Sequence, residues 1–300
     1  MTEALYPASV GELAPSDPRR LYCDLLKKTL TRYAFGEAWT PYRPRARSLR
    51  GLVYRQGLRL LRRRGMEIVL RYPFSAEARA QGQDWPPEAE TMVGLRRLDN
   101  LEHCITDVLR HGVPGDLIET GVWRGGAVIF MRAVLAAYGD PDRQVWVADS
   151  FRGLPKPRPH RVEDVEDALW QIPFLAVSMD QVKQNFRRYD LLDDRVRFLP
   201  GWFEDTLPTS PVERISVMRL DGDLYDSTMV ALRSLYPKLS VGGYTIIDDY
   251  NVVRGCKRAV DDFRAEHGIR DELRQVDSTC RYWQKSRDIG ESGRGADGLG

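Results

Sequence analysis

The stretch DLIETGVWRGGAVIFMRAVLAAY, residues 116–138, decides the fold of this chain. Residues 116–122 form an apolar run typical of a buried β-strand, and a glycine-rich turn follows it. Residues 127–138 are apolar on nearly every side, which is typical of a helix packed inside a core. A strand, a tight turn and a helix in this order make a βα unit, the building block of a parallel sheet.

The same alternation continues toward the C-terminus. Amphipathic helical stretches, such as the one that places Val182, Phe186 and Tyr189 on one face, separate further apolar runs. Strands are expected at residues 145–148, 195–199, 215–220, 243–247, 273–276 and 281–284. The pattern predicts an α/β fold built on a mostly parallel sheet.

The part of the chain before this alternation has a different composition and pattern. It contains many Arg and Pro residues and short helical patches, of which residues 21–32 are the clearest helix. We therefore expect an N-terminal helical segment over residues 1–93 and a main domain over residues 94–285. Residues 286–300 are polar and rich in glycine, which is typical of a disordered tail.

Residues 43–71 hold ten arginines and a single acid, Glu67. Two interpretations of this Arg-rich segment are open. It is either a solvated amphipathic helix or oligomer contact, or it meets an acidic or phosphate-bearing acceptor or a membrane surface. We favour the first interpretation.

Composition excludes several classes of protein. The 300 residues are 42% hydrophobic and 29% charged, which is typical of a folded globular chain. A net charge of +2 gives no overall field for nucleic acid, and no apolar run fits a signal peptide or a membrane span. The four cysteines are scattered, without a CxxC pair. We expect a cytoplasmic protein with no nucleic-acid partner and no membrane insertion.

Ligands of open α/β sheets bind at the carboxyl ends of the strands, and here those ends carry acids. In the first turn Gly121 permits close approach of the backbone, and Gly125 and Gly126 let the helix begin against the sheet. A dinucleotide site would need glycine where Glu119 stands, so this turn favours a cationic or zwitterionic ligand. Asp149, at the end of the next strand, is placed to accept hydrogen bonds from a ribose. S-adenosyl-L-methionine has both features.

A second group of acids follows two later strands. In the stretch LDGD, alternation along an extended chain would direct Asp221 and Asp223 to one side. Asp248 and Asp249 end the strand expected beside it. Carboxylates that converge in one cleft repel each other unless a cation neutralises them, and oxygen ligands favour Mg²⁺ or Ca²⁺. A bound metal would acidify an acceptor hydroxyl, and Asp223 could accept its proton.

Long strings of residues around these positions resemble the macrocin O-methyltransferase family. They are ETGVWRGG (119–126), VWVADSFRGLP (145–155), FLPGWFEDTLP (198–208), RLDGDLYDST (219–228), YPKLSVGG (236–243) and IIDDYN (246–251). Members of that family include mycinamicin- and novobiocin-pathway enzymes that methylate deoxysugar hydroxyls of natural products. The resemblance implies a class I methyltransferase Rossmann-like fold, with a seven-stranded sheet covered by helices on both faces and an N-terminal helical lid. It also implies Mg²⁺, a small glycosylated acceptor and self-association into a homo-oligomer.

The resemblance also assigns roles to single residues. Asp221, Asp248 and Asp249 match the metal ligands of the family, and Asp223 matches its general base. The residues that match the cofactor site are Met92, Glu119, Thr120, Gly121, Gly125, Asp149, Ser150 and Trp202. The sequence departs from the family between residues 35 and 81, where it carries extra residues in a region that forms the acceptor wall in relatives.

Three other functions remain open on the sequence. The nearest is a catechol-type O-methyltransferase, which uses the same metal chemistry on a phenolic diol. A protein that binds S-adenosylmethionine without catalysis is a second alternative. A nicotinamide oxidoreductase is the least favoured, because Glu119 occupies the position that a pyrophosphate needs.

Overall fold

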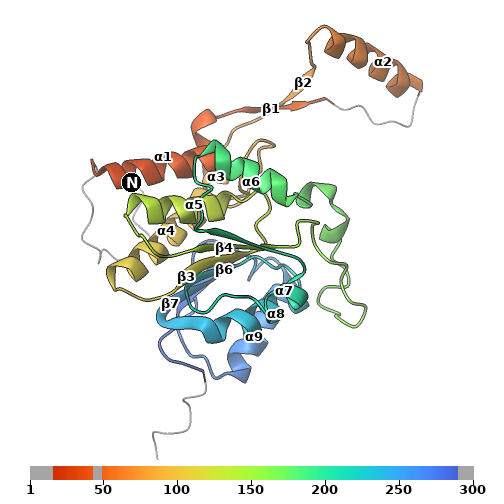
Figure 1. Cartoon of the computed structure of the whole chain (residues 1–300). Coiled ribbons are helices and arrows are strands. Elements are labelled where there is room, and N and C mark those ends of the chain that lie inside the picture. Colours follow the sequence, from red (N-terminus) through yellow and green to blue (C-terminus); the bar gives the residue numbers. More distant parts are fainter. Residues whose placement is uncertain (1–15, 43–48, 290–300) are drawn as a thin grey trace, which may run out of the picture.

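The computed structural model describes residues 16–42 and 49–289, and its centre is one seven-stranded sheet (Figure 1). The strand order is β5-β4-β3-β6-β7-β9-β8. Strands β3 to β7 are parallel, whereas β9 runs antiparallel to both β7 and β8. The strands are β3 Asp116–Thr120, β4 Val145–Asp149, β5 Val196–Pro200, β6 Ile215–Leu220, β7 Leu239–Ile247, β8 Arg274–Gln275 and β9 Arg281–Gln284. The expected α/β fold with a mostly parallel sheet is confirmed.

Helices cover both faces of the sheet because its buried strands are apolar on both sides. In β3, Leu117 packs into the core on one face and Ile118 into the core on the other, as alternation along a strand requires. Helices α1, α4, α5 and α6 cover the first face and α7, α8 and α9 the second (Figure 1). The bounds are α1 Pro18–Leu30, α4 Leu95–Arg110, α5 Gly126–Ala137, α6 Met179–Arg188, α7 Phe203–Thr206, α8 Tyr225–Leu235 and α9 Arg254–Glu266.

Within residues 16–42 and 49–289, four short 3₁₀ helices complete the connections. They are η1 Tyr33–Phe35, η2 Leu169–Gln171, η3 Pro173–Leu175 and η4 Tyr236–Lys238. Among the residues that the structure describes, no helix has the length and apolar character needed to cross a bilayer. The last residues of the expected tail, 290–300, lie outside the described part of the chain.

Helix α1 joins the N-terminal segment to the main core. The expected helix 21–32 begins earlier, since Asp17 caps it by accepting a hydrogen bond from the Arg19 amide at 2.8 Å, and Pro18 fits the first turn. Its buried face packs on α5 and α4. On the α4 side the buried Lys27 ammonium lies 2.6 Å from Asp99 and 2.8 Å from Glu102. The segment before residue 94 therefore shares a hydrophobic core with the sheet.

An arm extends away from this body (Figure 1). It consists of residues 38–72, in which β1 Ala38–Pro41 pairs antiparallel with β2 Val69–Tyr72, and α2 Leu49–Arg63 lies at the tip. Residues 43–48 within it lie outside the described part of the chain. After the arm, the short helix α3 Ala76–Ala80 leads the chain back to α4. The Arg-rich segment thus contains an exposed helix, as the simpler interpretation expects.

Strand β7 differs from its expected bounds. It begins at Leu239 and continues through the two glycines that were expected to open it. A Cβ on Gly243 would lie 2.7 Å from the Ser216 carbonyl oxygen, so glycine lets β7 and β6 approach where their register shifts. The apolar run marks only the buried half of the strand, because Ser240 to Gly242 lie nearer the surface.

Candidate active site

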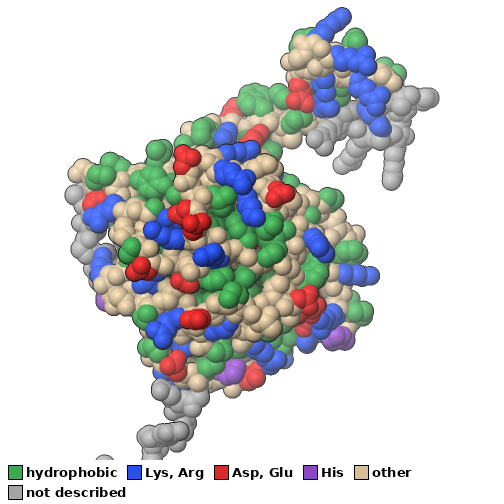
Figure 2. Space-filling model, viewed as in Figure 1, with side chains coloured by type: hydrophobic (Ala, Val, Ile, Leu, Met, Phe, Trp, Pro, Cys, Tyr) green, Lys and Arg blue, Asp and Glu red, His purple; other side chains and the backbone are tan. Residues whose placement is uncertain are grey.

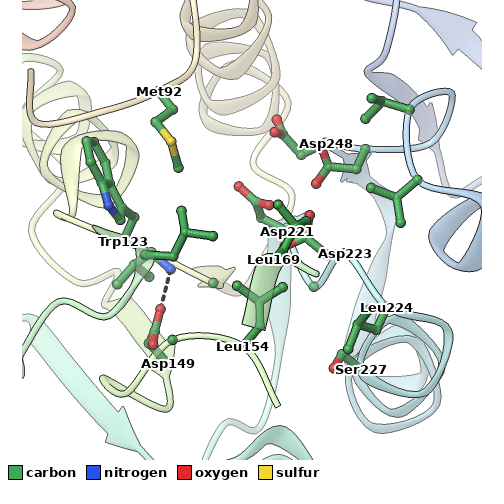
Figure 3. Close-up of a pocket in the computed structure, with 18 of the residues that line it drawn as sticks. Met92, Trp123, Asp149, Leu154, Leu169, Asp221, Asp223, Leu224, Ser227 and Asp248 are labelled. Atoms are coloured by element: carbon green, nitrogen blue, oxygen red, sulfur yellow. Dashed lines mark hydrogen bonds between the residues drawn. The ribbon is translucent and has the colours of Figure 1, made fainter. Parts of the chain in front are cut away.

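A cavity of about 590 Å³ lies at the carboxyl ends of the parallel strands. The register pairs Thr120 with Leu220, and Leu220 with Ile247, so the residues that follow these strands meet at one edge. The chain from Gln81 to Val93 and the loop after β4 supply the other walls. Figure 3 shows Met92, Trp123 and Asp149 on one side of this cavity and the aspartates of β6 and β7 on the other.

The turn after β3 is held by close backbone contacts. Gly121 has a φ of +79°, and a Cβ there would lie 1.9 Å from the Asp221 carbonyl oxygen. Gly126, at the start of α5, donates its N–H to the Glu90 carbonyl at 2.9 Å. This bond brings the chain around Thr91 and Met92 against the helix N-terminus, where both residues line the cavity.

Glu119 is buried beside this turn, and only one of its two carboxylate oxygens has a polar partner. Its Oε1 forms an ion pair with Arg219, but its Oε2 is buried without a hydrogen-bond partner among the described residues. Burial raises the pKa of Glu119 to about 8, against the opposite effect of Arg219. A buried, unpaired carboxylate oxygen in a cavity wall fits a cationic ligand group, such as the amino group of S-adenosylmethionine.

Asp149 ends β4 and helps to shape the turn. Its Oδ2 accepts the Val122 amide at 2.8 Å, and its Oδ1 accepts the Phe151 amide at 2.6 Å (Figure 3). Burial raises the pKa of this carboxyl group. A carboxylate oxygen can accept more than one hydrogen bond, so Asp149 retains acceptor capacity for a ribose diol at the cavity wall.

The structure brings most of the expected cofactor residues together. Met92, Glu119, Gly121, Asp149, Ser150 and Trp202 all line the cavity. Thr120 and Gly125 do not belong to the lining. Thr120 is fully buried at the end of β3, and a Cβ on Gly125 would meet Val182 of α6 at 2.8 Å, so the role of Gly125 is helix packing. Their assignment to the cofactor site stays a prediction.

Three aspartates gather at the opposite end of the cavity. Asp221, Asp223 and Asp249 each offer an oxygen atom within 4.8 Å of the others. Burial and mutual repulsion raise the pKa of all three carboxyl groups. An oxygen-only set with this much like charge fits a hard divalent cation.

The way in which Asp221 and Asp223 converge differs from the expectation. Strand β6 ends at Leu220, and the chain then turns, with the Leu224 amide 2.6 Å from the Gly222 carbonyl. Asp223 has a φ of +52°, in the left-handed region that non-glycine residues seldom adopt. The two carboxylates therefore meet through a tight, strained turn, and alternation along an extended strand is the wrong explanation.

Asp248 lies beside this cluster but faces two arginines. Its Oδ1 pairs with Arg219 and its Oδ2 with Arg97. Arg219 also lies 3.1 Å from Asp221, and Arg97 lies 2.7 Å from Asp277. The compact trio thus contains Asp223 where the family pattern places Asp248, so the division of these four acids between metal ligands and base stays a prediction.

The two arginines were not among the expected site residues. Arg219 could have been found from the sequence, because it is a charged residue inside the apolar run 215–220 and lies two positions before Asp221. In the structure it is 3% exposed and pairs with Glu119, Asp221 and Asp248, so one guanidinium group holds Glu119 beside the aspartates. Arg97 lies in helical register with the buried Leu101 and Cys104, and the packing of α4 brings it to Asp248.

The remaining wall of the cavity is apolar and comes from the loop between β4 and α6. Leu154, Leu169 and Phe174 line it, and the Trp123 indole donates a hydrogen bond to the Phe174 carbonyl at 3.0 Å. This wall could not be predicted from the sequence, because the loop lacks regular periodicity. Tyr225 is outside the cavity lining, and its hydroxyl donates a hydrogen bond to Asp262 at 3.1 Å.

Comparisons with known proteins agree with this geometry. The profile of the family described as Macrocin-O-methyltransferase (TylF) matches residues 19–285. The chain is 52% identical over 225 residues to the demethyldecarbamoylnovobiocin O-methyltransferase of Streptomyces niveus, covering 71% of this chain and 82% of that protein. It is 45% identical over 278 residues to the mycinamicin III 3''-O-methyltransferase of Micromonospora griseorubida, covering 91% of this chain and 100% of that protein.

A third relative and two solved structures extend the comparison. A tetracenomycin 4'-O-methyltransferase of Streptomyces olivaceus, whose full name specifies a dimethoxy-rhamnosyl acceptor, is 48% identical over 270 residues, which cover 89% of this chain and 94% of that protein. The structure of the O-methyltransferase NovP has a TM-score of 0.77 at 45% identity and covers 90% of this chain and 100% of that chain. The calicheamicin methyltransferase CalS11 shares the fold, with a TM-score of 0.53 at 18% identity over 93% of this chain and 99% of that chain.

The family match spans nearly all of the described chain, and the relatives cover most of its length. The class I methyltransferase fold and the family expected from the sequence are both confirmed. This chain belongs to the macrocin O-methyltransferase family and is an S-adenosylmethionine-dependent O-methyltransferase.

Proposed function

We propose that this enzyme methylates a hydroxyl group of a deoxysugar on a glycosylated natural product, and that it uses Mg²⁺. The carrying observation is that one cavity joins a half-satisfied Glu119 and the buried Asp149 to a cluster of three aspartates. The similar proteins also support the proposal, because their names specify novobiocin, tetracenomycin and mycinamicin acceptors.

Residues in different parts of the cavity would have different roles. Glu119 would bind the amino group of the methyl donor, and Asp149 would orient its ribose. S-adenosylmethionine supplies the methyl group when bound, and Mg²⁺ supplies acidification of the acceptor hydroxyl. Asp221 and Asp249 would hold the cation, with Asp248 released from one arginine as a further ligand. Asp223 would accept the hydroxyl proton as the new C–O bond forms and the C–S bond breaks.

The surroundings of Asp223 suit this role. In the free enzyme burial and repulsion from the neighbouring carboxylates raise its pKa well above its usual range. A cation held by Asp221 and Asp249 would offset this repulsion, so that Asp223 would be ionised and could accept a proton from an alcohol. The strained backbone at Asp223 keeps this group fixed beside Asp221 and Asp249.

An assay with labelled methyl donor tests the proposal. With a deoxysugar glycoside as the acceptor, we expect methyl transfer that EDTA stops and that added Mg²⁺ restores. Adding a catechol to the same reaction as a competing acceptor distinguishes a sugar methyltransferase from a catechol-type enzyme. We expect the labelled methyl group to be transferred to the glycoside. Undiminished turnover in chelator would contradict the metal, and preferential labelling of the catechol would contradict the sugar acceptor.

Replacing Glu119 with glutamine tests the donor end of the cavity. The neutral amide keeps the shape but removes the charge-assisted bond to the ammonium group, so we expect the Kd for S-adenosylmethionine to rise by about 10- to 100-fold. Isothermal titration calorimetry measures the change, and the exposed Asp205→Asn variant is the control for loss of a carboxylate. An unchanged Kd in the Glu119→Gln variant would remove this residue from the binding site.

The remaining expectations about the cell and the assembly are part of the same proposal. All four cysteines are free and buried, which supports a reducing cytoplasm as the location. We also propose a homo-oligomer and a small-molecule acceptor, with no nucleic-acid partner. The near-neutral net charge of +2 supports the last point.

A further inference from the structure

Asp164 is a buried acid between exposed side chains. It belongs to the wall loop, residues 150–178, which joins β4 to α6. This loop lies at the right-hand edge of the body in Figure 1, and in Figure 2 hydrophobic side chains are exposed there among charged ones. Val162 and Val165 are 72% and 57% exposed, whereas Asp164 is 2% exposed. Burying a carboxylate is unfavourable unless polar groups compensate, so we expect Asp164 to have specific partners.

The Asp164 carboxylate lies at the N-termini of two helices. Its Oδ2 accepts a hydrogen bond from the amide of Tyr225, the first residue of α8, at 2.9 Å. Its Oδ1 lies against Gly255 in the first turn of α9, where a Cβ would be 1.7 Å from this oxygen. The residues at the two cap positions, Leu224 and Val253, are apolar and cannot cap these helices. Asp164 therefore supplies the negative charge that both helix N-termini favour.

These two helices directly follow the aspartates of the site. Helix α8 follows the turn that carries Asp221 and Asp223, and α9 follows the turn that carries Asp248 and Asp249. All four of these aspartates line the cavity. One carboxylate of the wall loop is thus tied to both segments that carry the aspartate cluster.

A second contact ties the same part of the wall loop to α8. Arg161 pairs with Asp226 at 2.7 Å, and its guanidinium carbon lies 4.2 Å from the centroid of the Tyr225 ring. Both charged side chains of this pair stay partly exposed, so the pair contributes little to stability. The buried carboxylate of Asp164 is therefore the main anchor of the loop.

Two consecutive hydrogen bonds connect Asp164 to the apolar wall of the cavity. The Asp167 amide donates to the Asp164 carbonyl at 2.8 Å, and the Leu169 amide donates to the Asp167 side chain at 2.7 Å. Leu169 lines the cavity together with Asp221 and Asp223 (Figure 3). The position of this wall relative to the aspartates thus follows from the position of Asp164.

We propose that Asp164 is a positioning residue for the acceptor, an inference that rests on the proposed function because the acceptor would lie between this wall and the aspartates. Asp164 holds the wall at a fixed distance from the cluster, so that an acceptor packed on Leu169 presents its hydroxyl group to Asp223. Although Asp164 itself borders the cavity, its two carboxylate oxygens face α8 and α9. Its loss should therefore weaken acceptor binding more than it slows methyl transfer.

Steady-state kinetics of the Asp164→Ala variant test the proposal with the deoxysugar glycoside as acceptor. We expect the acceptor KM to rise at least about tenfold, kcat to stay within about threefold, and the Kd for S-adenosylmethionine to stay within about twofold. Asp164→Asn should bring the acceptor KM back to within about threefold of the wild type, because its amide oxygen still accepts the Tyr225 N–H. The control is Glu166→Ala, at an exposed acid of the same loop, which should match the wild type.

A substitution on the other side of the contact tests the same geometry. A methyl group on Gly255 would displace the Asp164 carboxylate, although alanine favours a helix more than glycine does. We expect Gly255→Ala to raise the acceptor KM at least about fivefold in the wild-type background. In the Asp164→Ala background it should raise this KM by at most about twofold, because the displaced carboxylate is then absent.

Hydrogen–deuterium exchange gives a readout that does not depend on the acceptor. In the Asp164→Ala variant, amides of residues 162–175 should exchange at least about tenfold faster than in the wild type, while those of β3 and β6 should be unchanged, which also shows that the variant is folded. Unchanged exchange in the loop, an unchanged acceptor KM, or equal losses in Asp164→Asn and Asp164→Ala would overturn the proposal. A wild type that does not methylate the glycoside would instead contradict the proposed function, and the exchange rates would still decide whether Asp164 anchors the loop.

Discussion

Replacing Asp223 with asparagine should reduce kcat by about 10²- to 10⁴-fold, the range that a positioned general base contributes. The amide has almost the same size as the carboxylate, but it cannot accept the hydroxyl proton. Because Figure 3 shows Asp223 on the side of the cavity opposite Met92 and Asp149, the Kd for S-adenosylmethionine should stay within about twofold of the wild type. Single-turnover rates and calorimetry on the same preparation give the two numbers.

The same variant separates a base from a metal ligand. If Asp223 acts as the base, saturating Mg²⁺ leaves the rate of the Asp223→Asn variant low. Recovery of the rate at high Mg²⁺ would instead show that Asp223 serves only as a ligand, as its place within 4.8 Å of Asp221 and Asp249 allows. The matched control is Asp194→Asn, at an exposed aspartate with no ion pair to a described residue, which should keep the wild-type rate.

Replacing Gly121 with alanine should strongly destabilise the fold and abolish binding of the methyl donor. The new Cβ would lie 1.9 Å from the Asp221 carbonyl oxygen, so the ends of β3 and β6 would have to separate. We expect a loss of roughly 3 kcal/mol or more in the free energy of unfolding. For a chain of this size that lowers the thermal unfolding temperature by about 6 °C or more. S-adenosylmethionine should no longer bind measurably, because the turn after β3 is displaced.

A second glycine provides the control for backbone conformation. Gly139 has a φ of +69°, close to that of Gly121, but a Cβ there would meet nothing within 4 Å. Gly139→Ala should therefore cost only the left-handed backbone penalty of about 1–2 kcal/mol and leave donor binding intact. Equal effects of the two substitutions would contradict the contact between Gly121 and Asp221 as the cause.

The sequence predicted the sheet well because its strands are buried on both faces. Apolar runs place β6 Ile215–Leu220 and β9 Arg281–Gln284 at their observed bounds, and the glycine turn places α5 within one residue of its start. Local patterns of this kind depend on neighbours along the chain. They can therefore be recognised without knowledge of the tertiary packing.

Site residues that directly follow a strand could be predicted from the sequence. Those that the packing of a helix brings to the site could not. Asp149, Asp221 and Asp248 end or follow strands, so their meeting at one edge follows from parallel topology. Arg97 reaches Asp248 only because α4 packs beside β7, and the two residues are 151 positions apart in sequence. No periodicity along the chain reports such a contact, and the same holds for the direction in which the arm extends.

Diffraction at a wavelength near the manganese absorption edge would show whether the aspartates after β6 and β7 hold a metal ion. Crystals of the enzyme grown with S-adenosylhomocysteine would be soaked in Mn²⁺, which takes oxygen ligands like those of Mg²⁺. We expect one anomalous peak within coordination distance of oxygen atoms of Asp221 and Asp249, beside the sulfur of the bound nucleoside. A strong peak elsewhere in the cavity, or none among these carboxylates at saturating Mn²⁺, would contradict this expectation.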